Sequence, residues 1–145
     1  MIPRTGRLLA LDWGEVRIGV AVSDETQLIA SPRATLTRRA GKRFPMPPFL
    51  ALVGQERPVG LIVGLPLTAE GSEEAAARSA REMGTLVSAR TELPLEFVDE
   101  RFSTARALGA IREMDGTTRG RKHDVDALAA AVLLQHYLDT RRNQP

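Results

Sequence analysis

Three acidic residues stand at positions where a charged side chain conflicts with its surroundings. Asp12 ends the expected strand 7–12, Glu100 follows the expected strand 95–99, and Asp126 lies in an Ala- and Leu-rich stretch. A carboxylate is costly to bury unless it is paired or bound to a metal. Carboxylates that converge on two divalent ions hydrolyse phosphodiesters, because one ion activates water and the other stabilises the leaving oxygen. Convergence of these three acids would therefore predict a metal-dependent phosphodiesterase site.

The simpler alternative is that each acid caps a helix or forms an ion pair. Taken one at a time, Asp12 and Glu100 favour that interpretation, because Arg17 and Arg101 lie close to them in the sequence. Exposed pairs of this kind contribute little to stability and require no catalytic role.

Asp126 can be placed by helical periodicity. It shares one helical face with four residues at three- and four-residue spacing: Ala129, Ala130, Leu133 and Tyr137. The carboxylate should therefore point toward the core. Asp124, two positions earlier, projects roughly 200° around the helix and is better suited to cap the N-terminus or to meet the helix dipole. Asp124 is the second candidate metal ligand on this helix.

The basic residues are unusually rich in arginine, since 18 of the 20 are Arg and only Lys42 and Lys122 are Lys. Arginine grips phosphate through a planar fork. Two segments concentrate this charge: Arg38, Arg39, Lys42 and Arg43 in the first, and Arg119, Arg121 and Lys122 in the second. They would contact a nucleic-acid backbone without reading its sequence, and salt would weaken that contact steeply. The alternative is that both are ordinary solvated loops.

Four further positions could serve substrate phosphate beside the metals. Arg17, Arg101 and Lys122 would act as phosphate clamps, although they could equally neutralise nearby carboxylates. Gly64 ends an apolar run, and a strand that ends in Gly lets backbone approach a phosphate closely. The alternative for Gly64 is a rigid turn between a strand and a helix.

Composition limits the remaining chemistry. The 145 residues are 43% hydrophobic and 26% charged, which predicts one ordinary domain over residues 1–145. The absence of cysteine excludes disulfides, thiolate metal sites and Cys nucleophiles, so any metal would be hard and bound by oxygen. Residues 1–7 lack a signal-peptide core, and no apolar run is long enough to span a bilayer. We therefore expect a cytoplasmic protein with no membrane partner.

Periodicity and turn residues predict the elements that position these residues. Strands are expected at 7–12, 16–22 and 27–36, with Pro32 marking an edge or an interruption in the third. A basic, proline-containing loop should span 37–48, and a helix 48–56. A strand at 59–64, a helix at 73–90 and a strand at 95–99 predict a parallel pair with a right-handed crossover.

The last part of the chain should be helical on either side of a basic loop. Ser103 is a good N-cap for a helix over 104–113, residues 115–122 should be flexible, and a helix should span 124–139. The prediction is an α/β protein whose five-stranded mixed sheet has three antiparallel and then two parallel strands, flanked by helices.

Four motifs, in this order along the chain, resemble the bacterial YqgF/RuvX family. They are Asp12-Trp13-Gly14-Glu15-Val16-Arg17-Ile18-Gly19-Val20-Ala21; Val63-Gly64-Leu65-Pro66-Leu67 with Gly71; Asp99-Glu100-Arg101-Phe102-Ser103-Thr104; and Lys122 with Asp126 and Ala129-Ala130. The resemblance extends from Leu8 to Leu138. Glu15, where the family usually has a small hydroxyl or basic residue, and the additional acid Asp124 depart from the pattern.

The resemblance implies a ribonuclease H-like fold related to the RuvC resolvases. It places the catalytic role on Asp12, Glu100 and Asp126, which would bind Mg²⁺ or Mn²⁺ in an endonuclease of structured nucleic acid. The substrates proposed within the family are the 5′ end of precursor 16S ribosomal RNA and four-way (Holliday) DNA junctions. Symmetric cutting of a junction would require a homodimer, whereas trimming an RNA end would not.

Two other classes of protein would also use parts of this pattern. A catalytically idle RNA-binding assembly factor could keep the same fold and acids. An ATPase of the related sugar-kinase or actin type also places an Asp-x-Gly turn at phosphates, but 145 residues leave no room for the second lobe that closes on ATP.

Overall fold

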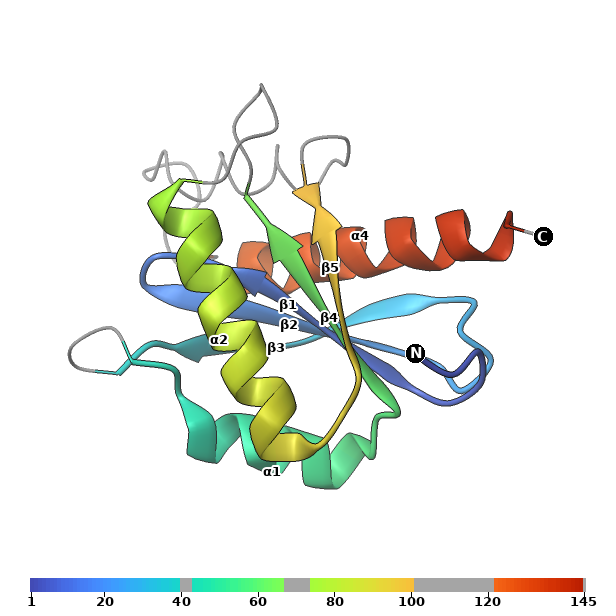
Figure 1. Ribbon diagram of the computed structural model, residues 1–145, viewed down its shortest axis with the longest axis horizontal. Helices are drawn as coiled ribbons and strands as arrows, with labels where there is room; N and C mark the ends of the chain where they lie inside the picture. The colour runs from blue at the N-terminus through green and yellow to red at the C-terminus, as the bar shows by residue number, and fades with distance from the viewer. Residues whose placement is uncertain (40–42, 67–73, 101–121, 145) are drawn as a thin grey trace.

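A five-stranded mixed sheet forms the centre of the molecule (Figure 1). The computed structural model describes residues 1–39, 43–66, 74–100 and 122–144. The strands lie in the order β3-β2-β1-β4-β5. Their bounds are β1 Leu8–Trp13, β2 Arg17–Ser23, β3 Ala30–Thr37, β4 Gly60–Leu65 and β5 Leu95–Asp99. β1, β2 and β3 pair antiparallel, and β1, β4 and β5 pair parallel, as the sequence predicts.

Helices cover both faces of this sheet. Helices α1 (Met46–Glu56) and α2 (Ala75–Thr91) lie on one face, and α4 (Lys122–Arg142) lies on the other (Figure 1). Alternation along β1 serves both layers, because Leu9 and Leu11 pack toward α1 and α2 while Leu8 and Ala10 pack toward α4. All four side chains are buried, which makes β1 the central strand in packing as well as in order.

The third strand is an edge strand, as Pro32 predicts, but it begins later than expected. Its pairing with β2 shifts register between Val20 and Ala21, beside Pro32. The expected start at Gln27 is wrong because Gln27 has a φ of 57° and turns its side chain inward. The Gln27 amide donates to the carbonyls of Pro3 and Gly6, so it fastens the N-terminus instead of extending the strand.

The predicted loop 37–48 is shorter and better anchored than its composition suggests. Helix α1 begins at Met46 instead of Pro48, because prolines are accepted in the first turn of a helix. Phe44 is buried, and its ring stacks 6.4 Å from that of Trp13 and meets Phe49 edge-on at 5.4 Å. An isolated antiparallel bridge joins the backbone of Arg39 to that of Arg43.

Several expectations fall outside the described residues. They include the helix expected over 104–113, most of the flexible segment 115–122, and the candidate residues Lys42, Arg101, Arg119 and Arg121. Among the helices of the described part, none has the length and apolar character needed to cross a membrane.

Candidate functional site

Asp12 lies on the central strand with a glycine beside it on each side. It pairs with Gly19 of β2 in the antiparallel register. On the other side Leu11 pairs with Val63 of β4, so Gly64 is the next residue alongside Asp12. Asp12 follows Ala10 by two positions and therefore points to the face that α4 covers, where it is 3% exposed.

Helix α4 approaches β2 closely because Gly19 has no side chain. A Cβ at Gly19 would lie 1.9 Å from the backbone oxygen of Asp126. The Asp126 side chain is completely buried, as are Ala129, Ala130 and Leu133 on the same helical face. The predicted inward face of this helix is therefore confirmed, and it places Asp126 over the strand next to Asp12.

The carboxylate of Glu100 occupies the corresponding position over β4. A Cβ at Gly64 would lie 2.3 Å from Glu100 Oε1, so the glycine provides the room that this side chain fills. Glu100 directly follows β5 and is 7% exposed. Gly64 follows Ile62 by two positions, which directs this contact to the α4 face as well. Asp126 and Glu100 thus lie on opposite sides of Asp12, at the carboxyl end of β1.

Arg17 joins this group through a partner distant in sequence. Its Nε donates to Asp126 Oδ2 at 2.7 Å, and the two side chains are 18% and 0% exposed. Sequence proximity suggested Arg17 as an ion-pair partner of Asp12, and the structure shows that it also has a partner far along the chain. Arg17 and Gly19 are two positions apart on β2, so both face α4, and α4 supplies Asp126.

The donor set suits a hard divalent cation. Asp12, Glu100 and Asp126 offer carboxylate oxygens, the ligands that Mg²⁺ and Mn²⁺ prefer. As the described side chains stand, no group of three or more acidic, His or Cys residues is arranged to hold a metal ion. Asp124 and Lys122 belong to the first turn of α4, and their side chains are outside the described set. The three carboxylates are therefore ligands of the right type for such an ion. Arg17 already contacts one of their oxygens, Asp126 Oδ2.

Arg38 is held against the end of β1 and the residues that follow it. Its guanidinium lies 4.2 Å from the centre of the Trp13 ring and donates to the carbonyls of Gly14 and Glu15, both at 3.0 Å. Burial lowers the pKa of Arg38, although the nearby Glu15 carboxylate opposes that shift. Arg39 and Arg43 lie beyond it on the bridged turn and are exposed.

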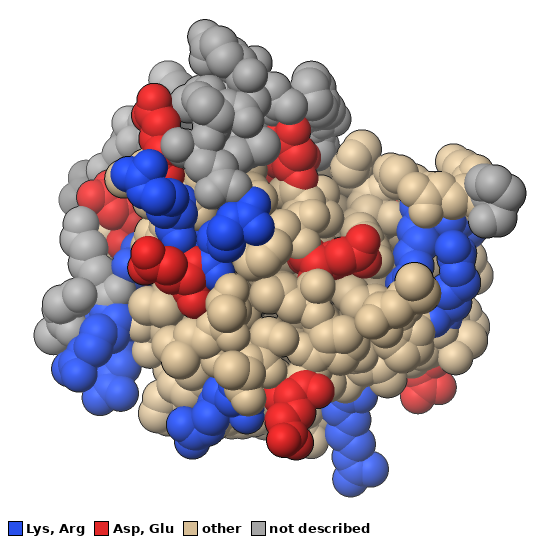
Figure 2. Space-filling model, viewed as in Figure 1, with Lys and Arg blue, Asp and Glu red and all other residues tan. Residues whose placement is uncertain are grey.

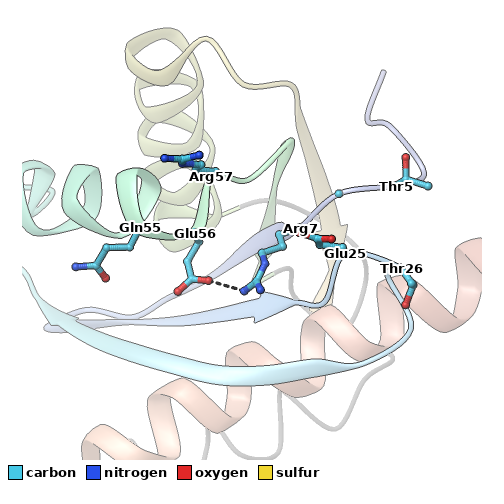
Figure 3. Close-up of a pocket in the computed structure, with 8 residues that line it drawn as sticks. Thr5, Arg7, Glu25, Thr26, Gln55, Glu56 and Arg57 are labelled. Atoms are coloured by element: carbon cyan, nitrogen blue, oxygen red, sulfur yellow. Dashed lines mark hydrogen bonds and ion pairs between the residues drawn. The ribbon is translucent and has the colours of Figure 1, made fainter.

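A concave region lies at the end of β1 away from Asp12. This open depression of about 720 Å³ is lined by residues from the chain before β1, the turn after β2 and the end of α1 (Figure 3). Arg7 reaches Glu56 across it at 2.8 Å. Arg33 also binds Glu56, and its hydrogen bond is the main reason that the pKa of Glu56 is lowered. Paired in this way, Glu56 closes a structural ion-pair network.

Charge on the described surface is mixed in sign. Figure 2 shows acidic and basic side chains interspersed around a largely uncharged centre on the face that carries α2. A polyanion would therefore be held by local basic groups and not by the net charge, which is only +2.

Comparison with known proteins identifies the family. A family model described as "RuvX: Holliday junction resolvase" matches residues 6–140. The chain belongs to the RuvX family. Its match includes Asp12, Glu100 and Asp126, together with the two glycines that give them room. The resemblance seen in the sequence motifs is thereby confirmed.

Three curated relatives of this chain share one name. A protein of Paracoccus denitrificans is 40% identical, covering 97% of this chain and 89% of its own, and one of Ruegeria pomeroyi is 39% identical, covering 98% and 92%. A protein of Rhodopirellula baltica is 36% identical, covering 97% of this chain and 80% of its own. Each is named "Putative pre-16S rRNA nuclease". This RuvX chain is thus related over nearly its full length to proteins named as nucleases.

Solved structures establish the fold. RuvC of Thermus thermophilus, solved in complex with a Holliday junction substrate, superposes with a TM-score of 0.54 at 15% identity and covers 95% of this chain and 96% of that one. A second structure of the same protein gives a TM-score of 0.52 at 16% identity. The RuvX chain therefore has the ribonuclease H-like α/β fold of RuvC, with the mixed five-stranded sheet that the sequence predicts.

Sequence reasoning missed two residues that build this site. Gly19 was not singled out, although a glycine inside a strand, two positions before Ala21 on the same face, marks a place where a helix can approach closely. Phe44 was treated as part of a polar loop, although a lone aromatic between basic and proline residues is the one side chain there able to enter the core.

Proposed function

We propose that this protein is a metal-dependent endonuclease that processes the 5′ end of precursor 16S ribosomal RNA. The observation that carries the proposal is the placement of three buried carboxylates, with Asp12 between Asp126 and Glu100 at one end of the sheet. A buried carboxylate must be paired or bound to a metal, and the gathering of three such groups at one edge of a sheet favours a functional site. The names of the relatives favour RNA as the substrate.

The roles proposed for the residues follow their positions. Asp12, Glu100 and Asp126 would hold Mg²⁺ or Mn²⁺, with Asp124 as a further candidate ligand on the same helix. A divalent ion bound there would supply the charge that activates water and stabilises the leaving oxygen. Gly64 is proposed to bring strand backbone close to a substrate phosphate, on the side of the strand where its missing side chain makes room for Glu100.

The basic residues are proposed to hold the nucleic-acid backbone. Arg17 borders the acids, and Arg38, Arg39 and Arg43 line the segment that Phe44 fastens to the core. Lys42, Arg101, Arg119, Arg121 and Lys122 complete the proposed set. All of them would act on phosphate, so the expected recognition is of backbone shape and not of base sequence.

A second candidate substrate is the four-way DNA junction. The description of the matching family model and the RuvC-like fold favour it. Two symmetric cuts would require two copies of the site, so this candidate implies a homodimer on the junction. A monomer suffices for trimming an RNA end.

The test is cleavage of both substrates in parallel. A precursor 16S RNA 5′ fragment and a synthetic four-way DNA junction are incubated with Mg²⁺ or Mn²⁺ and with wild-type protein, Asp12→Asn or Asp139→Asn. Asp139 is a matched control because it is a half-exposed acid on α4, paired with Arg142 away from the site. Cleavage of the RNA that is lost only in Asp12→Asn supports the proposal.

The other outcomes are equally informative. Cleavage of the junction alone would transfer the function to the second candidate. Binding of nucleic acid without metal-dependent cleavage would instead identify an RNA-binding assembly factor. Cleavage that survives Asp12→Asn would show that these acids are not the catalytic set.

A further inference from the structure

The contact between Arg17 and Asp126 places a resident cation on a proposed metal ligand. Arg17 Nε lies 2.7 Å from Asp126 Oδ2, and the Asp126 side chain has no exposed surface. Removing one partner of a buried ion pair destabilises a protein, because the remaining charge is left uncompensated. The guanidinium therefore neutralises the buried Asp126 carboxylate, as a metal ion bound to that carboxylate would.

The backbone fixes Arg17 in this place. Arg17 is the first residue of β2, pairs with Thr37 of β3, and faces α4. Gly19 brings the α4 backbone down onto the same strand, so Asp126 comes within reach of the guanidinium. The contact thus depends on the packing of β2, β3 and α4. A chance ion pair between two surface side chains would not depend on the fold in this way.

We propose that Arg17 is a built-in counter-cation that competes with the divalent metal ion for the Asp126 carboxylate. This inference rests on the proposed function, because it concerns the same metal site. In the metal-free protein, Arg17 neutralises Asp126 and allows the acids to be buried. Metal binding must then work against an existing ion pair, so the wild-type affinity is lower than these three carboxylates alone would give.

The competition predicts a gain of metal affinity when the arginine is removed. Arg17→Met and Arg17→Gln should bind Mn²⁺ at least about fivefold more tightly than wild type, the lower end of typical coupling between mutually exclusive ligands. Arg17→Lys keeps the positive charge and should stay near the wild-type affinity. Isothermal titration of Mn²⁺ into the full-length protein measures each dissociation constant without reference to cleavage.

Stability provides the second readout. Without metal, Arg17→Met should unfold at lower temperature than wild type because Asp126 has lost its counter-charge. Saturating Mn²⁺ should raise its melting temperature by more than it raises that of wild type, since a tighter ligand stabilises more. Arg17→Gln serves as the folded variant if Arg17→Met does not fold without metal.

Arg33→Met is the matched control. Arg33 lies on the neighbouring strand, and its Nε binds Glu56 Oε2 at the same 2.7 Å, but at the other end of the sheet. Its removal should lower stability equally with and without Mn²⁺ and leave the dissociation constant unchanged.

Two results would overturn the inference, and only the second would also exclude the proposed metal site. Unchanged or weaker Mn²⁺ binding in both neutral variants, with wild type still binding, would show that Arg17 does not compete and would leave the proposed metal site intact. Absence of Mn²⁺ binding in wild type and in every Arg17 variant would remove the metal site itself, and the inference with it.

Discussion

Gly64 and Glu100 fit against each other so closely that a Cβ on the glycine would lie 2.3 Å from Glu100 Oε1. We expect Gly64→Ala to push the Glu100 side chain aside, because the added Cβ would also lie 2.8 and 2.9 Å from its Cδ and Cγ. Displacement of a catalytic group by about 1 Å can lower the rate roughly 100-fold. Single-turnover cleavage measures that loss, and chemical denaturation measures the free energy of unfolding.

Gly54→Ala is the control for this prediction. A Cβ on Gly54 meets nothing within 4 Å, and the residue lies inside α1. The replacement should stabilise the protein by about 0.5–1 kcal/mol and leave cleavage unchanged. Full activity in Gly64→Ala would show that the position of Glu100 does not matter to the reaction.

Gly19→Ala should act first on folding. The added Cβ would lie 1.9 Å from the backbone oxygen of Asp126, so the whole of α4 must move to accept it. Overpacking against backbone of this kind costs about 3 kcal/mol or more. Urea denaturation should detect the loss directly. A variant as stable as wild type would mean that α4 does not press on β2 as described.

Salt dependence tests the basic segment. Replacing Arg39 and Arg43 together by Gln should reduce the slope of log K against log [salt] by about 1.4–1.8, since each phosphate contact contributes about 0.7–0.9. Arg57→Gln removes an exposed charge of the same type near the end of α1 and should leave the slope as it is. Equal slopes in all three proteins would exclude the segment from nucleic-acid contact.

Acid stability tests the turn after β2. Asp24 Oδ1 accepts the backbone N–H groups of Leu28 and Ile29, both at 2.9 Å. These bonds, that from Ile29 above all, lower the pKa of Asp24 from 3.8 to about 2. A lowered pKa means that Asp24 stabilises the folded state above pH about 4 and loses this effect as the pH falls toward 2.

Asp24→Asn keeps an acceptor oxygen but has no charge to titrate. The difference in unfolding free energy between wild type and Asp24→Asn should therefore be constant above pH about 5 and shrink between pH about 4 and 2. Urea titrations at several pH values measure it. A difference that stays constant to pH 2 would contradict the assignment.

Local patterns predicted most of the secondary structure because the relevant forces are local. β5 spans Leu95–Asp99 as predicted, since Pro94 and the acidic residues around it delimit a short apolar run. α1 and β3 differ at their starts, where tertiary contacts decide. Gln27 could extend a strand by composition, but its amide is used by the carbonyls of the N-terminal segment.

The candidate site was predicted as a set of acids but not as a set of contacts. Periodicity was enough to predict the burial of Asp126, because three- and four-residue spacing puts it on the same face as Ala129, Ala130 and Leu133. It could not pair Arg17 with Asp126, which are 109 residues apart, since only the order of strands and the hand of the crossover bring α4 over β2. The closeness of the two layers depends on Gly19, whose contribution is the absence of a side chain.

The aromatic stack under the basic segment sets a length scale for substrate handling. Trp13 follows Asp12 directly in β1, and its ring is packed against Phe44, one residue after Arg43. If the exposed arginines hold a nucleic-acid backbone, as proposed, that backbone would lie at a constant offset from Asp12. The number of nucleotides between the phosphate bound by these arginines and the phosphate that is cut would then be set by the fold and not by the substrate sequence.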